Sequence, residues 1–176
     1  MKFQFDKGGK RVWLAIVGTG TLILLVAFAM AQQGSRLGAE DAPLALSASI
    51  ATHLDSGSAP QSSIPSGASD TQLFAMITDS SQKVLAASTS SGSAGLTPPT
   101  GSFIYAKNYG IDKFTWQPDS HNRYATIIVY KKPYYIVTGQ SLTEPERRIA
   151  LYGSFMLLAW LVMLIWTTLV LTWNRK

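Results

Sequence analysis

Residues 123–141 read RYATIIVYKKPYYIVTGQS, and this stretch has the clearest strand pattern in the chain. Two runs rich in β-branched and aromatic residues, 123–130 and 134–141, flank Lys131-Lys132-Pro133. Such residues favour strands, and a short polar segment with a proline favours a turn between them. The stretch therefore predicts a β-hairpin, and its first arm is the strongest strand in the chain.

Three further strands are expected upstream of this hairpin. Residues 73–78 (LFAMIT) and 83–87 (KVLAA) predict a second hairpin around a polar turn, and 113–116 (KFTW) predicts another strand. A short helix is expected over 102–110, because Gly110 is a typical helix terminator. The Ser/Pro/Gly-rich stretches 56–70 and 88–101 are expected to be loops.

Helices are expected on both sides of these strands. Residues 32–54 carry leucine and isoleucine at near-helical spacing, although Pro43 is a point of interruption. A second helix is expected from Glu144, with Pro145 at a tolerated first-turn position. The order predicts an α+β fold in which a small antiparallel sheet has covering helices.

Two uncharged apolar runs, 12–31 and 149–173, enclose this region. The first has 20 residues, and at 1.5 Å per residue a helix of that length matches the roughly 30 Å hydrocarbon core of a bilayer. The second has 25 residues and spans the same core with some tilt. Both runs therefore predict transmembrane helices, with the lipid bilayer as a partner.

The net charge of +5 lies at the two ends of the chain. Residues 1–11 carry four basic residues and one acidic residue, residues 174–176 carry two basic residues, and the remainder has nine of each sign. A nucleic-acid-binding domain carries its excess on a folded face, so nucleic acid is not an expected partner. The positive-inside rule predicts cytoplasmic tails at 1–11 and 174–176 and an extracytoplasmic domain at 32–148. Arg147 and Arg148 oppose this orientation, and we expect Glu144 and Glu146 to offset them.

A cleaved signal peptide is the alternative interpretation of the first run. Ala29-Met30-Ala31 fits the small-x-small cleavage pattern. The apolar run exceeds the usual upper limit of about 15 residues for such peptides, which favours an uncleaved anchor.

Four segments resemble the extracytoplasmic PAS-like (Cache-type) sensor region of bacterial two-component histidine kinases. The segments are QQGSRLGAEDAPLALSASIATHL (32–54), FAMITDSSQKVLAAS (74–88), FTWQPDSHNRYATIIVY (114–130) and YYIVTGQSLTEPERRI (134–149). They correspond to the family's entry helix, opening hairpin, tryptophan strand with long central strand, and final strand feeding the exit helix. The resemblance implies a PAS-like sheet, a sensor role and a location in a bacterial plasma membrane.

A kinase also needs a phosphorylatable histidine and an ATP-binding domain on the cytoplasmic side. Here the two histidines, His53 and His121, lie between the apolar runs. We expect either an input module that signals through its transmembrane helices to a membrane protein partner or a second copy, or a piece of a longer protein. The alternative function is a structural or accessory subunit of a membrane assembly.

The resemblance implies a small-molecule ligand held by aromatic residues and one arginine between the sheet and its helices. Arg123 opens the central strand and is suited to pair with a carboxylate. The candidate ligand-binding residues are Tyr105, Trp116, Arg123 and Tyr124. The alternative is that these rings fill the core of a domain otherwise rich in alanine, serine and glycine, because aromatics bury large areas.

Neither catalysis nor cofactor binding is predicted. The sequence lacks the nucleophile-elbow, zinc-protease, P-loop and dinucleotide-binding motifs, and it has no cysteine. Asp79, Asp112, Asp119 and His121 lack a fixed metal-ligand spacing, so no metal site is expected. The predicted spans carry no ionisable residue, which argues against a transporter or an ion pore.

Overall fold

The structure is a computed structural model, and it describes residues 7–65, 72–88, 97–120 and 122–173. The chain divides into two compact units. One, the sheet unit, comprises Arg36–Pro145, and the other, the helix unit, comprises Met1–Ser35 with Glu146–Lys176. Each unit is described by itself. His121 and parts of the two predicted loops, 66–70 and 89–96, lie outside the described residues.

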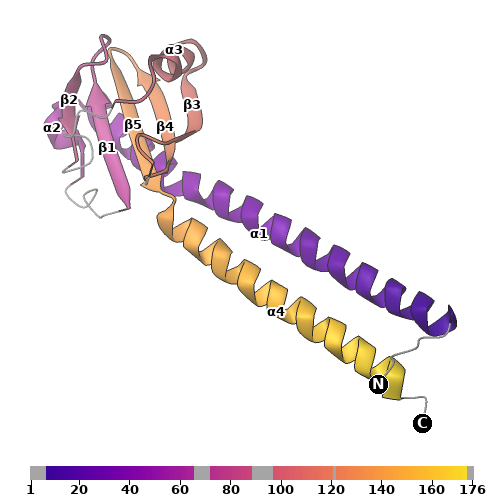
Figure 1. Ribbon diagram of the computed structural model, residues 1–176. Helices are drawn as coiled ribbons and strands as arrows, with labels where there is room; N and C mark the ends of the chain where they lie inside the picture. The colour runs from indigo at the N-terminus through magenta and orange to yellow at the C-terminus, as the bar shows by residue number, and fades with distance from the viewer. Residues whose placement is uncertain (1–6, 66–71, 89–96, 121, 174–176) are drawn as a thin grey trace. The chain divides into compact units, whose positions relative to one another are not determined.

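The sheet unit is built on a five-stranded antiparallel sheet of order β2-β1-β5-β4-β3 (Figure 1). This confirms the predicted α+β fold and every predicted strand to within two residues. Within the described residues the strands are β1 (Leu73–Thr78), β2 (Val84–Ala87), β3 (Ile111–Trp116), β4 (Tyr124–Lys131) and β5 (Tyr134–Ser141). The helices of the same residues are α1 (Lys7–Asp55), α2 (Pro60–Ser63), α3 (Thr100–Tyr109) and α4 (Thr143–Trp173).

Strand β5 lies at the centre of the sheet, although it comes last in the sequence. It pairs with β1 along its length, with Gln140 opposite Leu73 and Tyr135 opposite Thr78. On its other side it pairs with β4, with Ser141 opposite Tyr124 and Tyr134 opposite Lys131. Its YIVTG segment, residues 135–139, is buried on both faces, as expected of a central strand. β5 therefore joins the two hairpins, β1–β2 and β4–β5, into one sheet.

The two faces of the sheet are built from different side chains, because successive residues of a strand point to opposite faces. We call one the aromatic face; it packs against Phe103 and Ala106 of α3, and its buried apolar strand residues include Phe74, Met76, Trp116, Ile128, Tyr135 and Val137. We call the other the aliphatic face; it packs against Ile50 of α1, and its buried apolar strand residues include Ala75, Ile77, Ala86 and Ile136. One covering helix thus lies on each face.

Helix α1 runs without interruption through Pro43, the position at which the sequence suggested a break in the helix. Proline removes one backbone donor from a helix and normally weakens it. Here the proline is fully buried, and Thr138 Oγ1 on β5 donates a hydrogen bond of 2.9 Å to the Pro43 carbonyl. The tertiary contact offsets the local cost, which the sequence pattern alone does not reveal.

The predicted loop 56–70 contains a short helix, α2, and in this the prediction was wrong. Pro60 occupies a first-turn position, and Ser62 Oγ and Ser63 Oγ each donate to the Ala59 carbonyl. Ile64, just after α2, packs with the aliphatic face. Serine and proline are turn formers, and here they form one helical turn instead of an irregular loop.

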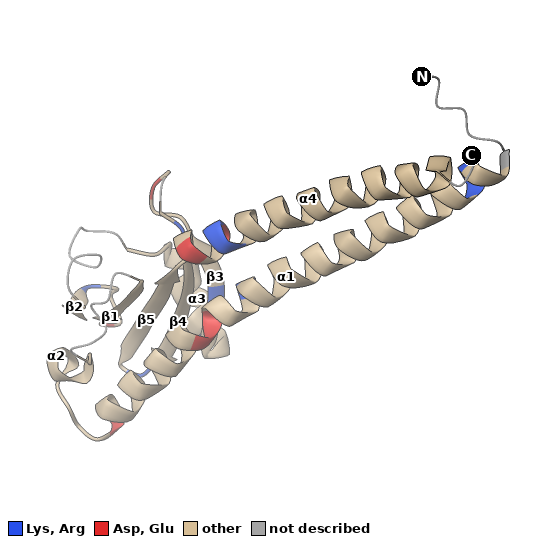
Figure 2. Ribbon diagram, turned by 90° about the horizontal axis from the view of Figure 1, so that it is seen from below, with Lys and Arg blue, Asp and Glu red and all other residues tan. Residues whose placement is uncertain are grey.

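The helix unit consists of the N-terminal part of α1 and most of α4. Among the described residues these are the two helices long and apolar enough to cross a membrane. Figure 2 shows no charged residue along the middle of either helix. Most of their large apolar side chains are exposed, Met30 and Trp166 among them, so they are not core helices of a soluble protein. The two helices indicate a membrane location.

On each helix of this pair, one row of half-buried residues recurs at alternating spacings of three and four residues. This spacing is typical of helices packed along a left-handed seam. In α1 the seam holds Trp13, Val17, Gly20, Leu24, Ala27 and Ala31, and in α4 it holds Ile149, Gly153, Met156, Trp160, Met163 and the buried Thr167.

Candidate functional site

Trp116 and Tyr124, two of the predicted ligand residues, come together on the aromatic face. They form the last cross-strand pair of β3 and β4, and their ring centroids lie 6.1 Å apart. Phe74 on β1 packs edge-on against both rings, with centroids 6.0 Å from Trp116 and 5.3 Å from Tyr124. The three rings form a packed cluster, which we call the ring cluster.

Gly139 on β5 makes room for the ring cluster. A Cβ atom at this position would collide with the Phe74 ring, so Phe74 lies directly on the Gly139 backbone. Thr126 on β4 is the cross-strand neighbour of Gly139 and is 1% exposed. Glycine therefore sets how closely Phe74 approaches the centre of the sheet.

Two threonine hydroxyls of the aromatic face, those of Thr78 and Thr126, are buried without a hydrogen-bond partner among the described residues. Leaving such a group unpaired costs about 1–3 kcal/mol. Unpaired buried polar groups are uncommon in native cores and call for an explanation. Both hydroxyls therefore have unused hydrogen-bonding capacity inside the aromatic face.

Tyr105 does not join the ring cluster. It lies on α3 with half of its surface exposed, and its ring packs on Tyr109 at a centroid distance of 4.5 Å. Ile104, Tyr105 and Tyr109 are 55%, 50% and 70% exposed, and we call these three residues the α3 patch. The patch was not foreseen from sequence, because the boundaries of a short helix do not tell which side faces the sheet.

Arg123 is exposed and directly precedes β4. Its carbonyl oxygen accepts a 2.8 Å hydrogen bond from the Leu142 amide, and Leu142 is the single residue between β5 and α4. Leu142 is buried with Ala39 of α1 and Ala125. Arg123 therefore lies where the sheet meets the start of α4.

Tyrosines crowd the other end of the aromatic face. Tyr135 packs edge-on against Phe103 and at a centroid distance of 4.9 Å from Tyr130. Burial, and secondarily the neighbouring Tyr130, raises the pKa of the Tyr135 hydroxyl above its usual value near 10. Tyr135 therefore stays neutral at physiological pH, as suits a core residue.

Two of the acidic residues weighed for a metal site, Asp79 and Asp119, accept hydrogen bonds within their own turns. Asp79 Oδ1 accepts hydrogen bonds from Ser81 N, Ser81 Oγ and Lys83 N, and these bonds lower the pKa of Asp79. Asp119 accepts from the backbone and side-chain nitrogens of Asn122. In the part of the chain that the structure describes, no three His, Cys, Asp or Glu residues gather in a metal-binding arrangement.

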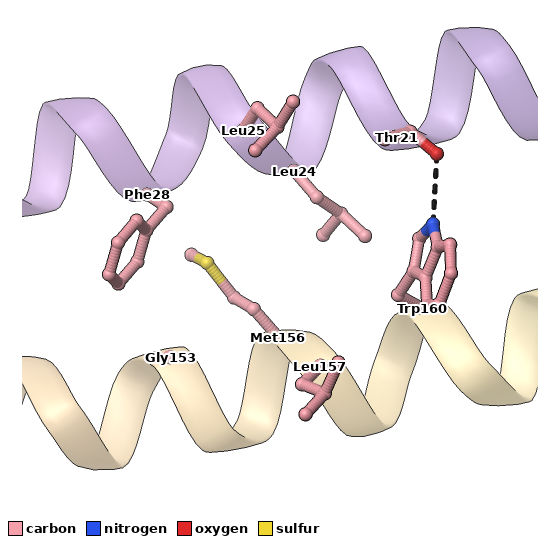
Figure 3. Close-up of a pocket in the computed structure, with 8 residues that line it drawn as sticks. All are labelled: Thr21, Leu24, Leu25, Phe28, Gly153, Met156, Leu157 and Trp160. Atoms are coloured by element: carbon pink, nitrogen blue, oxygen red, sulfur yellow. Dashed lines mark hydrogen bonds between the residues drawn. The ribbon is translucent and has the colours of Figure 1, made fainter.

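The helix unit contains an apolar groove of about 370 Å³ (Figure 3). It is lined by Thr21, Leu24, Leu25 and Phe28 of α1 and by Gly153, Met156, Leu157 and Trp160 of α4. The hydroxyl group of Thr21 already has a hydrogen-bond partner, because its Oγ1 accepts a 2.8 Å bond from Trp160 Nε1. The groove is suited to hydrocarbon contact and not to a polar ligand.

Comparisons with known proteins do not identify a family for this chain. No family model matches the sequence, and searches of curated proteins and of solved structures return no significant match.

Proposed function

We propose that the chain is a membrane-anchored, extracytoplasmic sensor-like module of the PAS-like (Cache-type) kind, which binds a small ligand and signals through its transmembrane helices to a partner. In this proposal the sheet unit lies outside the cytoplasm of a bacterial cell and both termini lie inside. The absence of a catalytic centre and of a cofactor remains a prediction.

One observation supports this proposal above the others: strand β5 is attached to both long helices. Thr138 in the middle of β5 donates to the Pro43 carbonyl of α1, and only Leu142 separates the end of β5 from α4. A displacement of the central strand is therefore passed to both helices at once. That is the requirement for an input carried across a bilayer by helix movement.

The ligand in this proposal carries a carboxylate and binds beside the ring cluster. Trp116 and Tyr124 supply the apolar wall, and Arg123, which directly precedes β4, supplies the cation at the same end of the sheet. Arginine suits this role because its planar fork matches a carboxylate with two parallel hydrogen bonds. Binding there acts on the Arg123–Leu142 backbone bond that precedes α4.

The test is thermal unfolding of the full chain in detergent with small carboxylates, amino acids and divalent cations. A ligand that binds the native state stabilises it by about 2.7 kcal/mol at a hundredfold excess over Kd. We expect a carboxylate to raise Tm and Arg123→Ala to abolish the rise, whereas Lys132→Ala, an exposed change elsewhere, retains it. No shift with any compound, from a protein that unfolds cooperatively, contradicts the ligand-binding proposal.

Helix coupling is tested separately from ligand binding. The double change Ile149→Pro and Ala150→Pro breaks the helical hydrogen bonding of α4 just after the sheet unit. We expect the Tm shift by a ligand to persist and the response of the partner to disappear. An unchanged partner response contradicts signalling through α4.

The α3 patch favours a second candidate function, that of an accessory subunit in a membrane assembly. Exposed apolar surface on a small domain is typical of a protein-binding site. In this case Ile104→Ser with Tyr109→Ser releases a co-purifying membrane protein and leaves Tm nearly unchanged. Retention of the partner by this variant contradicts docking through the α3 patch.

A further inference from the structure

The two apolar helices carry the same pair of residues at the same spacing. Residues 13–21 of α1 read WLAIVGTGT, and residues 160–168 of α4 read WLVMLIWTT. Each segment begins with Trp-Leu and ends, eight residues after the tryptophan, with a threonine. In antiparallel helices this spacing places the tryptophan of each helix opposite the threonine of the other.

The helix unit forms both of these bonds. Trp13 Nε1 donates to Thr168 Oγ1 at 3.1 Å, and Trp160 Nε1 donates to Thr21 Oγ1 at 2.8 Å. Figure 3 shows the second bond at one end of the apolar groove. The arrangement is reciprocal, because each helix supplies one donor and one acceptor.

Close packing at two glycines agrees with the same alignment of the helices. The Phe28 ring lies against Gly153, where an added Cβ would come within 3.3 Å of it. Gly20 lies against Met163, whose side chain would collide with a Cβ at that position. Both contacts depend on a glycine facing a large side chain across the seam.

A slide of one helix along the other by one turn removes hydrogen bonds that an apolar environment cannot replace. In one direction, Leu164 comes opposite Trp13 and Val17 comes opposite Trp160, so both indoles lose their acceptors. In the other direction, Thr172 comes opposite Trp13, but Leu25 comes opposite Trp160. Every one-turn slide therefore leaves at least one indole N–H unpaired, which is costly away from water.

We propose that the reciprocal Trp13–Thr168 and Trp160–Thr21 bonds lock the register of the two helices, so that they move as one body and do not slide past each other. The lock belongs to the helix unit alone. It goes beyond the proposed function and holds whether or not the sheet unit binds a ligand.

The test is disulfide cross-linking of the full chain in membranes, for which the cysteine-free sequence is a clean background. A cysteine at Phe28 is combined with a second cysteine at Gly153 for the observed register. It is combined with one at Ile149 or at Leu157 for the two one-turn slides. With the native threonines we expect the 28/153 pair to form at least about fivefold faster than the other two, from the 1–2 kcal/mol of an interhelical hydrogen bond in a membrane.

Removing the hydroxyl of Thr21 should allow the one-turn slide that the 28/157 pair reports, but not the opposite slide that the 28/149 pair reports. Thr21→Val is nearly isosteric and removes the acceptor of Trp160, while Trp13 still finds Thr172 in one direction. We therefore expect the 28/157 cross-link to rise by about tenfold and the 28/149 cross-link to stay slow. Thr172→Val added to Thr21→Val should return the 28/157 rate towards its original value, and Thr21→Ser is the matched control that keeps the hydroxyl.

Two results overturn the lock. The first is cross-linking of the 28/149 or 28/157 pair as fast as the 28/153 pair with all threonines in place. The second is an unchanged 28/157 rate in Thr21→Val, or an equal rise in both slid pairs. Neither result bears on the Tm shifts that test the sensor proposal, so the two proposals fail separately.

Discussion

The aromatic and aliphatic faces of one sheet are held to their covering helices in different ways. On the aromatic face, α3 is held by interlocking rings such as Phe103 against Tyr135. On the aliphatic face, α1 is held by small and aliphatic side chains around Ile50 and by the Thr138–Pro43 hydrogen bond. Two ion pairs at the edges, Lys113–Glu40 and Lys131–Asp55, add to the attachment of α1.

The difference implies that α1 shifts over the sheet more easily than α3 does. Interlocked rings fix an orientation, because a tilted or edge-on pair loses its favourable geometry when one ring turns. The alanine and isoleucine side chains of the aliphatic face form a smoother surface than interlocked rings. The exposed ion pairs of α1 add little to stability. Since α1 continues into the helix unit, the more adjustable face carries one of the two helices that the proposed signal uses. Four predictions test this contrast.

The largest effect is expected from Phe103→Ala on α3. Phe103 is fully buried in the aromatic face, and removing a buried phenylalanine side chain costs about 3–5 kcal/mol. The measurement is denaturant unfolding of the full chain in detergent, followed by the circular dichroism of the sheet. The neighbouring Ile104→Ala is the control, since this side chain is 55% exposed and should change stability by less than about 0.5 kcal/mol. Equal effects of the two changes would contradict the packing role of Phe103.

Gly139→Ala should destabilise the aromatic face by about 1–3 kcal/mol, because the new methyl group displaces the buried Phe74 ring. Phe74→Leu in the same chain should restore part of the loss by opening space. Gly101→Ala is the matched control, since nothing lies within 4 Å of an added Cβ there and alanine favours helix α3. A neutral Gly139→Ala would show that Phe74 does not need this glycine.

The contact between Gly139 and Phe74 also shows which features of the fold could be predicted from the sequence. The β-branched and aromatic content of 123–130 and 134–141 predicted strands that the structure confirms, because strand propensity is a local property of the sequence. It did not reveal that Gly139 seats Phe74, which lies 65 positions earlier in the chain, because strand order is set by non-local pairing.

The candidate site was foreseen in part. Trp116 and Tyr124 lie together as a cross-strand pair, whereas Tyr105 lies on the outer side of α3 with Tyr109. A short helix carries aromatic residues on more than one side, and its apolar spacing did not single out the side that packs. Whether any of these residues binds a ligand remains a prediction.

Thr138→Val tests the polar tie of the aliphatic face and should cost about 0.5–1.5 kcal/mol. Valine keeps the shape of the buried side chain but removes the hydroxyl that donates to Pro43, and Thr138→Ser keeps the bond while losing a methyl group. If α1 is the adjustable helix, hydrogen exchange of amides near Pro43 should accelerate in Thr138→Val and not in Phe103→Ala at matched stability. Equal acceleration in both variants would erase the contrast between the faces.

The smallest effect is expected from the ion pairs of α1. Lys113 Nζ lies 3.2 Å from Glu40 Oε2, and both side chains are about one-third to two-fifths exposed. A double-mutant cycle of Lys113→Ala and Glu40→Ala should give a coupling energy of about 0.2–1 kcal/mol, which falls as salt rises because the pair is screened. The Lys131–Asp55 pair should behave alike. A salt-independent coupling well above 1 kcal/mol in either cycle would mean that α1 is clamped at the edges of the sheet, and the aliphatic face would then be no easier to move than the aromatic one.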